Sequence, residues 1–175
     1  YLVKYFVTID SEDIELVLED NSDPGANVEF KNLLDSLADV RIKYYYSKKS
    51  VSQTENCDRA VSRAQGEYVT MLGDDDIFSR HLVEYARRWS RERIDAILPV
   101  KGVYIWPDVT PRLYKNKMSG LFKSGDFSGV VNYIDAGALP SEVMKTGGTQ
   151  ILNLPRVYHG VVRNDVLKKV FEDCG

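Results

Sequence analysis

The sequence is poor in three features that often reveal a protein's class: cysteine, an excess of basic residues, and long apolar runs. Its two cysteines, Cys57 and Cys174, are too few for a disulfide framework or a CxxC metal site, and they fit a reducing, cytoplasmic setting. The net charge of −3 argues against broad binding to a nucleic-acid backbone. No apolar run approaches the ~18 residues of a membrane-spanning helix. What remains is an ordinary globular composition in a chain of 175 residues, long enough for one domain with a core.

Helical and strand-like segments alternate along the first part of the chain. Leu2, Tyr5, Phe6 and Ile9 recur at helical spacing, which predicts an opening helix. Strand-like runs follow at residues 14–18, 40–46, 67–73 and 96–106. The first run is almost continuously apolar, which is typical of a strand covered on both faces. Such alternation predicts an α/β fold with a mainly parallel (mixed) sheet flanked by helices.

Capping residues mark where the intervening helices begin and end. The starts that we expect are Asn27, Ser52 with Glu55 as a capping box, Ser79, and Asn164 for the last helix. Gly66 is placed to end the helix that Ser52 begins. Leu82, Ala86 and Trp89 would form the buried stripe of the helix after Ser79. The stretch between residues 107 and 160 breaks the alternation, and we expect it to be loop-rich, with one short helix at residues 141–145.

Acidic residues follow two of the predicted strands. Glu19-Asp20 follows the first, and Asp74-Asp75-Asp76 follows the third. Parallel strands bring their carboxyl ends to the same edge of a sheet, where ligands of open α/β sheets bind. One divalent cation would relieve the repulsion between neighbouring carboxylates, and oxygen ligands without His or Cys suit magnesium or manganese. The simpler alternative is an acidic helix start, which gains only about 0.3–1 kcal/mol. For Asp20 the alternative is an Asx turn, which is compatible with ligand binding.

The stretches LVLEDNSD and NCDRAVSRAQGEYVTMLGDDDIF resemble the nucleotide-binding half of family 2 glycosyltransferases, which have the GT-A, Rossmann-like fold of nucleotide-diphospho-sugar transferases. The resemblance covers residues 14–90 well and returns faintly at RVYHGVVRNDVLKKV. It implies a nucleotide-sugar-binding half at residues 1–106 and a loop-rich acceptor-side region at residues 107–175. The family's first strand would precede the opening helix, so we expect the chain to be a piece that lacks both ends of the fold.

The resemblance also implies roles for individual residues. Asp20 and the adjacent Asn21 fall where the family contacts the nucleotide base, and Asp58 falls where the family usually has asparagine. Asp74 lies where the DXD motif meets the nucleotide. Asp75 is the first choice for the metal ligand and Asp76 is the alternative, with Asp76 left open between the metal and the helix start. One alignment places the first motif position on Gly73, a departure that keeps the choice among the three acids open.

The activity that the resemblance implies is metal-dependent, inverting transfer of a sugar from a nucleotide-diphosphate donor, such as a UDP-sugar, with Mn or Mg. The acceptor would be a glycan, a lipid-linked molecule or another compound, as in bacterial polysaccharide biosynthesis. The enzyme would be hexosyltransferase-like and cytoplasmic, with peripheral contact at the inner face of the membrane left open. The catalytic residue is unknown, because the family's general base lies beyond the last matching segment. A non-catalytic nucleotide-sugar-binding module and a Mg-dependent phosphotransferase are the alternatives.

Overall fold

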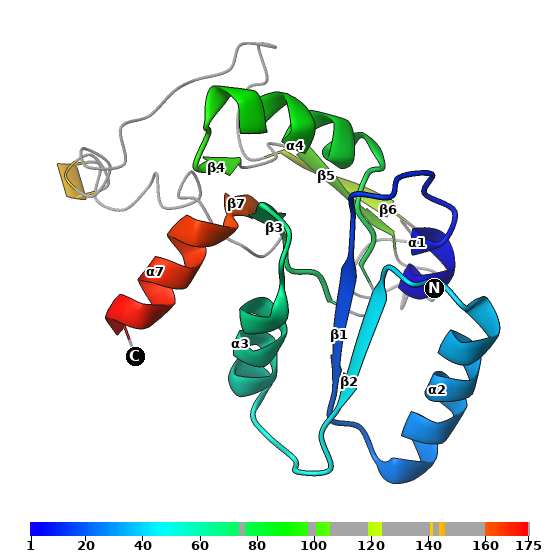
Figure 1. Ribbon diagram of the computed structural model, residues 1–175. Coiled ribbons are helices and arrows are strands. Elements are labelled where there is room, and N and C mark those ends of the chain that lie inside the picture. The colour runs from blue at the N-terminus through cyan, green and yellow to red at the C-terminus, as the bar shows by residue number, and fades with distance from the viewer. Residues whose placement is uncertain are drawn as a thin grey trace. The chain divides into compact units, whose positions relative to one another are not determined.

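The computed structural model describes residues 1–73, 76–97, 101–105, 119–123, 141, 144–145 and 160–174. The chain divides into two compact units, Tyr1–Ile97 together with Val157–Gly175, and Leu98–Arg156. The elements of the first unit (Figure 1) are α1 (Leu2–Phe6), β1 (Leu16–Asp20), α2 (Pro24–Leu37), β2 (Ile42–Tyr46), α3 (Gln53–Arg63), β3 (Tyr68–Val69), α4 (His81–Glu92), β4 (Ala96–Ile97), β7 (Val161–Arg163) and α7 (Asn164–Cys174). The predicted division at residue 106 is a different one, because it separates a donor-binding half from an acceptor-side region by function. It stays a prediction.

Strands β1 and β2 form a parallel pair in the register Leu16↔Ile42 to Asp20↔Tyr46. Side chains alternate between the two faces of a strand, and partners in register share a face. One face therefore carries Asp20 with Tyr44 and Tyr46, and the other carries Glu19 with Tyr45. Figure 1 shows α2 and α3 on opposite sides of this pair. The predicted strand is confirmed, but it runs from Leu16 to Asp20 rather than over residues 14–18, and all five of its residues are half-buried rather than buried.

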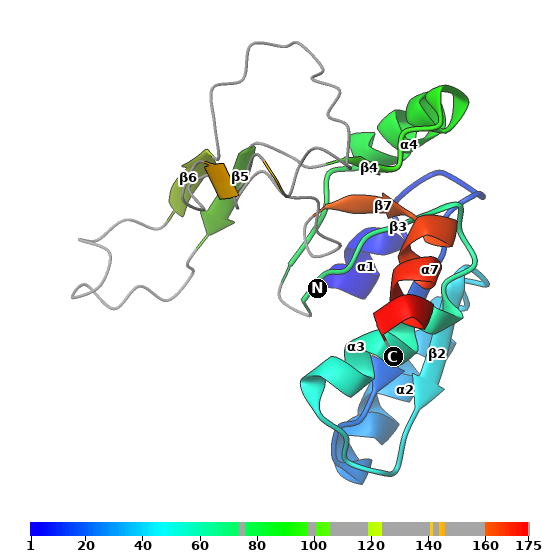
Figure 2. The ribbon, with the colours of Figure 1, turned by 90° about the vertical axis from the view of Figure 1, so that its left-hand side faces the viewer.

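A second, antiparallel sheet has the order β3-β7-β4. Tyr68 pairs with Arg163, and Ala96 pairs with Val162, so the late strand β7 lies between two earlier ones. Strands β3 and β7 lie side by side in both Figure 1 and Figure 2. The α/β alternation is present, but the described sheets are small and mixed. The prediction that β3 ends beside β1 in one parallel sheet is not met by the described strand pairs. Its partner is a segment distant in the sequence, which periodicity cannot reveal.

The main apolar core lies where α3, β3, β7 and α7 meet. Its buried residues are Val61, Ala64, Val69, Val162 and Leu167. Asn164, 7% exposed, closes this junction by donating from Nδ2 to the carbonyl oxygens of Ala64 (3.0 Å) and Gly66 (2.8 Å). Asn164 was predicted to cap the last helix. It is instead the first residue of α7, and its side-chain amide is used across the junction rather than along the helix.

The opening helix forms as its spacing predicts. Leu2, Phe6 and Ile9 are buried, and Phe6 is only 2% exposed. The guanidinium of Arg41 lies over the Phe6 ring, 4.9 Å from its centre, and donates to the carbonyl oxygens of Ile9 (2.6 Å) and Ser11 (2.7 Å). Arg41 therefore fastens the first segment to the start of β2.

One predicted helix start, Asn27, is wrong, and another, Ser52, is confirmed. Helix α2 begins at Pro24, directly after Asp23. Proline suits the first position of a helix, because an N–H at that position would have no partner within the helix. The predicted cap Asn27 lies inside α2. The Ser52 hydroxyl does cap α3, accepting from the Glu55 N–H at 3.1 Å. The Glu55 carboxylate pairs with Arg59 (2.6 Å) instead of completing the capping box.

The end of α3 does not need the glycine that was predicted to end it. Ala64 is the C-cap and is already extended, with φ −63° and ψ 133°. A glycine at position 66 has a different advantage, because it avoids a tight contact. A Cβ at this position would lie 3.2 Å from the Tyr68 carbonyl oxygen, which is closer than an ordinary van der Waals contact.

Helix α4 begins at His81, two residues after the predicted cap Ser79. The Ser79 hydroxyl nevertheless accepts from the His81 N–H at 3.3 Å. The stripe predicted to be buried is wrong, because Leu82, Ala86 and Trp89 are half-buried and no residue of α4 is buried.

The second unit contains the antiparallel pair β5 (Lys101–Ile105) and β6 (Ser119–Lys123). The strand-like run at 96–106 is thus confirmed as two strands, β4 and β5, whereas β6 was not predicted. The described residues 141, 144 and 145 are helical, in agreement with the predicted short helix. Most of the region between residues 107 and 160 lies outside the described residues.

Candidate functional site

Asp20 ends β1 and is held by two donors. Its Oδ2 accepts from the Tyr44 hydroxyl at 2.6 Å, and its Oδ1 accepts from the Ser22 N–H at 2.8 Å. Burial raises the pKa of Asp20, but the hydrogen bonds from Ser22 and Tyr44 outweigh it, so the pKa lies below its usual value. Asp20 is therefore an ionised acceptor at the carboxyl end of a parallel strand, and the predicted Asx-turn bond to Ser22 is formed as well.

Tyr44 also belongs to this site, although it was not predicted as a site residue. Its hydroxyl accepts from the Asn27 amide of α2, and the Phe30 ring packs edge-on against its ring, 5.7 Å between centres. Burial, together with the bond to Asp20 and its charge, raises the pKa of Tyr44 to about 12. The only signal in the sequence is the alternation of side chains along a strand, which places Tyr44 on the same face as Tyr46, the partner of Asp20.

Asn21 and Asp58, both predicted to bind the nucleotide, have different surroundings. Asn21 donates from Nδ2 to the Val51 carbonyl oxygen at 3.1 Å, which ties the end of β1 to the loop before α3. Asp58 is exposed on α3, and its side chain makes no hydrogen bond or ion pair with another described residue. The structure therefore gives Asn21 a structural bond and leaves both ligand roles as predictions.

Asn56, on the first turns of α3, was missed by the sequence analysis. It donates from Nδ2 to the Glu19 carbonyl oxygen at 2.9 Å, while its buried Oδ1 has no hydrogen-bond partner. A buried amide oxygen without a donor costs stability. The bond from Nδ2 to the end of β1 is therefore the contact that holds the Asn56 side chain in place.

Glu19 and Asp20 were predicted to lie together at the sheet edge, but they point to opposite faces of β1. The Glu19 side chain is 2% exposed, and its Oε2 lies 3.0 Å from Nε of Arg63 on α3. The Arg63 guanidinium also lies over the Tyr45 ring, 4.0 Å from its centre. Glu19 is thus a buried ion-pair partner under α3, and only Asp20 faces the α2 side.

Of the three consecutive aspartates, Asp74 and Asp75 lie outside the described residues. Asp76 accepts from the Gly73 N–H through Oδ2 at 3.1 Å, and its own N–H donates to the Gly73 carbonyl oxygen at 3.3 Å. Because α4 begins at His81 and Arg80 occupies its N-cap position, the alternative that Asp76 starts that helix is wrong. Carboxylate oxygens each have a second lone pair, so this turn fits a carboxylate that also meets Mn or Mg. Within the described part of the chain, no three His, Cys, Asp or Glu side chains form a group that could hold a metal.

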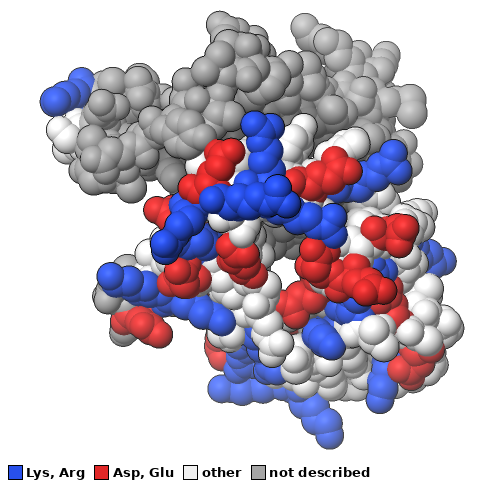
Figure 3. Space-filling view, turned by 45° about the horizontal axis from the view of Figure 1, so that its top comes forward, with Lys and Arg blue, Asp and Glu red and all other residues white. Residues whose placement is uncertain are grey.

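Acidic and basic side chains are interspersed on the face seen in Figure 3. Several charges of the first unit are paired across elements: Arg87 of α4, for example, binds Asp13 before β1 through Nη2 (2.5 Å). These bonds hold the pKa of Asp13 well below its usual value. The first unit therefore carries local ion pairs, and the face in Figure 3 is a mixed rather than a uniformly basic surface.

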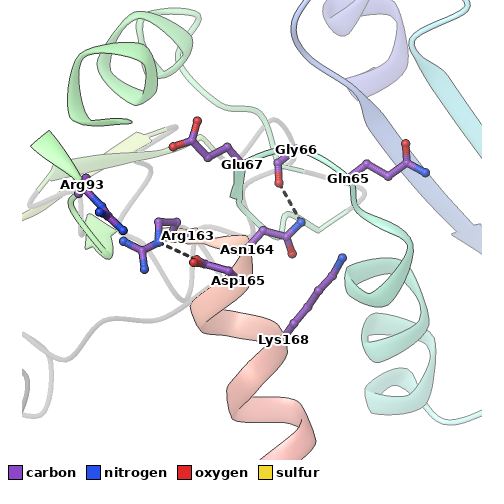
Figure 4. A pocket seen from close by; sticks show the side chains of 8 residues that line it. All are labelled: Gln65, Gly66, Glu67, Arg93, Arg163, Asn164, Asp165 and Lys168. Carbon is purple, nitrogen blue, oxygen red and sulfur yellow. Dashed lines mark hydrogen bonds and ion pairs between the residues drawn. The ribbon is translucent and has the colours of Figure 1, made fainter. Parts of the chain in front are cut away.

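A polar cleft of about 470 Å³ lies at the start of α7, near the amino end of β3 (Figure 4). Several of its polar groups are already engaged: Lys168 donates to the Ala64 carbonyl oxygen at 3.1 Å, and Arg163 pairs with Asp165 (2.6 Å) and Asp95 (2.7 Å), although the buried Oδ1 of Asn164 has no partner. The cleft is therefore part of the junction around Asn164 rather than of the site at Asp20.

Comparison with known proteins confirms the resemblance. The model of the family described as "Glycosyl transferase family 2" matches residues 6–138, more than half of the chain. An uncharacterized glycosyltransferase of Mycoplasma genitalium is 31% identical over 114 residues, which cover 62% of this chain and 38% of that relative. The chain thus matches well under half of the relative's length. No solved structure matches significantly.

Proposed function

Because the chain belongs to glycosyltransferase family 2, we propose that the protein transfers a sugar from a nucleotide-diphosphate donor, a UDP-sugar, to an acceptor hydroxyl. The observation that carries this proposal is Asp20, an ionised carboxylate held at the carboxyl end of a parallel strand pair. Ligands of open α/β sheets bind at such strand ends. We also propose that the reaction depends on a divalent metal and inverts the anomeric configuration, and that the sheet around β1 is mainly parallel in the complete fold.

Asp20 would contact the nucleotide base. Each carboxylate oxygen has two acceptor positions, and the bonds from Tyr44 and Ser22 use one on each oxygen. The remaining positions suit an N–H of a base. Asn21 and Asp58 are proposed to lie at the same nucleotide, Asn21 through its backbone because its amide is bonded to Val51.

The aspartate run would meet the ribose and the diphosphate. We propose Asp74 for the nucleotide and Asp75 for the metal, with Asp76 as the alternative metal ligand. When bound, Mn or Mg would neutralise charge on the departing diphosphate. The hydrogen bond from the Gly73 N–H holds the Asp76 carboxylate in the turn that follows β3 in the sequence.

The acceptor side of the reaction carries no residue assignment. Inversion needs a carboxylate base that takes the acceptor proton, and no residue is proposed for that role. The acceptor classes named above, a cytoplasmic location and contact with the inner face of the membrane remain proposals. No helix in the described part of the chain is long and apolar enough to cross a membrane.

Calorimetry on the full-length protein with UDP and Mn²⁺ tests the donor site. Asp75→Ala should abolish metal-dependent binding, and Asp20→Asn should weaken UDP binding about tenfold, which corresponds to ~1.4 kcal/mol. Asp35→Asn is the matched control, because Asp35 is an exposed acid of α2. Equal UDP binding by all three variants and the native protein would overturn both assignments.

Turnover distinguishes an enzyme from a binding module. The full-length protein should release UDP from a UDP-sugar in the presence of Mn²⁺ and an acceptor mixture. Tight UDP binding without any release from a panel of UDP-sugars would favour the non-catalytic module, and hydrolysis of an aryl phosphate would favour the phosphotransferase.

A further inference from the structure

The carboxylate of Asp20 is oriented by a chain of contacts that starts on α2. The Asn27 amide donates to the Tyr44 hydroxyl, and that hydroxyl donates to Asp20 Oδ2 at 2.6 Å. A phenol has one proton, so the donor from Asn27 fills an acceptor position and the proton is directed to Asp20. Phe30, one turn after Asn27, packs edge-on against the same ring. Helix α2 thus fixes both the ring and the hydroxyl of Tyr44.

This arrangement fixes the plane of the Asp20 carboxylate. Tyr44 holds Oδ2 from the neighbouring strand, and the Ser22 N–H holds Oδ1 from the following turn at 2.8 Å. Two donors on different oxygens oppose rotation about the terminal side-chain bond, which is otherwise a soft torsion. The unused lone pairs of Asp20 therefore point in set directions before any ligand arrives. Preorganisation of this kind raises affinity by reducing the ordering cost of binding.

We propose that Tyr44 is a positioning residue for the nucleotide base, acting through Asp20, with Asn27 setting the direction of its hydroxyl proton. The inference rests on the proposed function, in which Asp20 contacts the base. It predicts that Tyr44 matters for the nucleoside part of the donor and not for the diphosphate, which the aspartate run would meet. A tyrosine that merely stabilised the β1–β2 pair would affect both parts alike.

The test compares two tyrosines of β2 that lie on the same face. Tyr44→Phe removes the hydroxyl that binds Asp20. Tyr46→Phe makes the same chemical change where the hydroxyl has only a long contact, 3.4 Å, with the Ser22 carbonyl oxygen. Each full-length variant is titrated by calorimetry with UDP and with inorganic pyrophosphate, both in the presence of Mn²⁺.

Tyr44→Phe should weaken UDP binding by up to about tenfold, the loss expected for Asp20→Asn, because Tyr44 acts only through that carboxylate, and it should leave pyrophosphate binding unchanged. Tyr46→Phe should change neither. A second signature is pH: without the Tyr44 bond the charged form of Asp20 is less favoured, so UDP affinity should begin to fall at a higher pH on acidification.

Three results would overturn the inference, and they separate it from the proposed function. Unchanged UDP binding by Tyr44→Phe, with UDP bound normally by the native protein, refutes the positioning role alone. Equal losses of UDP and pyrophosphate binding show a structural role. A native protein that binds pyrophosphate but no UDP refutes both the base site and this inference. If Tyr44→Phe does not fold, Asn27→Leu carries the same test, with a smaller loss of UDP binding and none for pyrophosphate.

Discussion

Replacing Arg63 by methionine should destabilise the protein by about 3 kcal/mol, because the change leaves the Glu19 carboxylate buried without its cation. The Glu19 side chain is 2% exposed, and its Oε2 has no aligned hydrogen bond, so the charge of Arg63 at 3.0 Å is its main compensation. Removing one partner of a buried ion pair costs about 3–5 kcal/mol. The Arg63 side chain is 39% exposed, which reduces this to about 2–3 kcal/mol. Loss of the contact with the Tyr45 ring adds about 0.5–1 kcal/mol.

Urea unfolding of the full-length protein measures this cost, and a double-mutant cycle isolates the pair. Arg63→Met combined with Glu19→Gln should be less destabilised than the sum of the single variants, because the double variant no longer buries a charge. Arg59→Met is the matched control on the same helix, since its partner Glu55 is 48% exposed and such pairs contribute below about 1 kcal/mol. If Arg63→Met and Arg59→Met unfold at the same urea concentration, the argument from burial is refuted.

Two further predictions concern stability. Asn164→Leu should lower the free energy of unfolding by about 1–3 kcal/mol, because the Gly66 carbonyl oxygen loses its side-chain donor. The Ala64 carbonyl oxygen keeps the donor from Lys168. Urea unfolding measures this loss, and an unchanged midpoint would contradict the prediction. Between pH 10 and pH 12 the native protein should lose stability more steeply than Tyr44→Phe, because the pKa of Tyr44 is raised to about 12 in the folded state and ionisation near pH 10 favours the unfolded chain. Parallel pH profiles of the two proteins would refute that assignment.

Local signals in the sequence predicted local structure well. The Ser52 hydroxyl caps α3 as its spacing from Glu55 indicates, and the tyrosine-rich run at residues 42–46 is a strand. Competing local signals explain the misses. Proline at the first position of α2 determines the start of that helix, so Asn27 is left free to bond with Tyr44. Both residues are good helix starters, and only the three-dimensional neighbours decide which one is used.

Sheet connectivity could not be predicted from the sequence, because it depends on contacts between distant segments. Strand β3 pairs with β7, whose residues 161–163 lie far along the chain, and that pairing is antiparallel. Alternating helices and strands indicate a class of fold but not which strand lies beside which. The directions of Glu19 and Asp20 could not be predicted either, because they depend on how far β1 extends. Since β1 includes both residues, their side chains point to opposite faces.

The contrast between Glu19 and Asp20 is the physical reason for assigning function to one acid and not to its neighbour. Both are half-buried residues at the end of β1, but Glu19 faces α3 and is compensated by the cation Arg63. Asp20 faces α2 and receives only the neutral donors Tyr44 and Ser22; no ion pair of the described residues involves it. Neutral donors orient a carboxylate and keep it ionised without cancelling its charge. A ligand that offers further donors gains from meeting such a group, whereas at Glu19 it would have to displace Arg63.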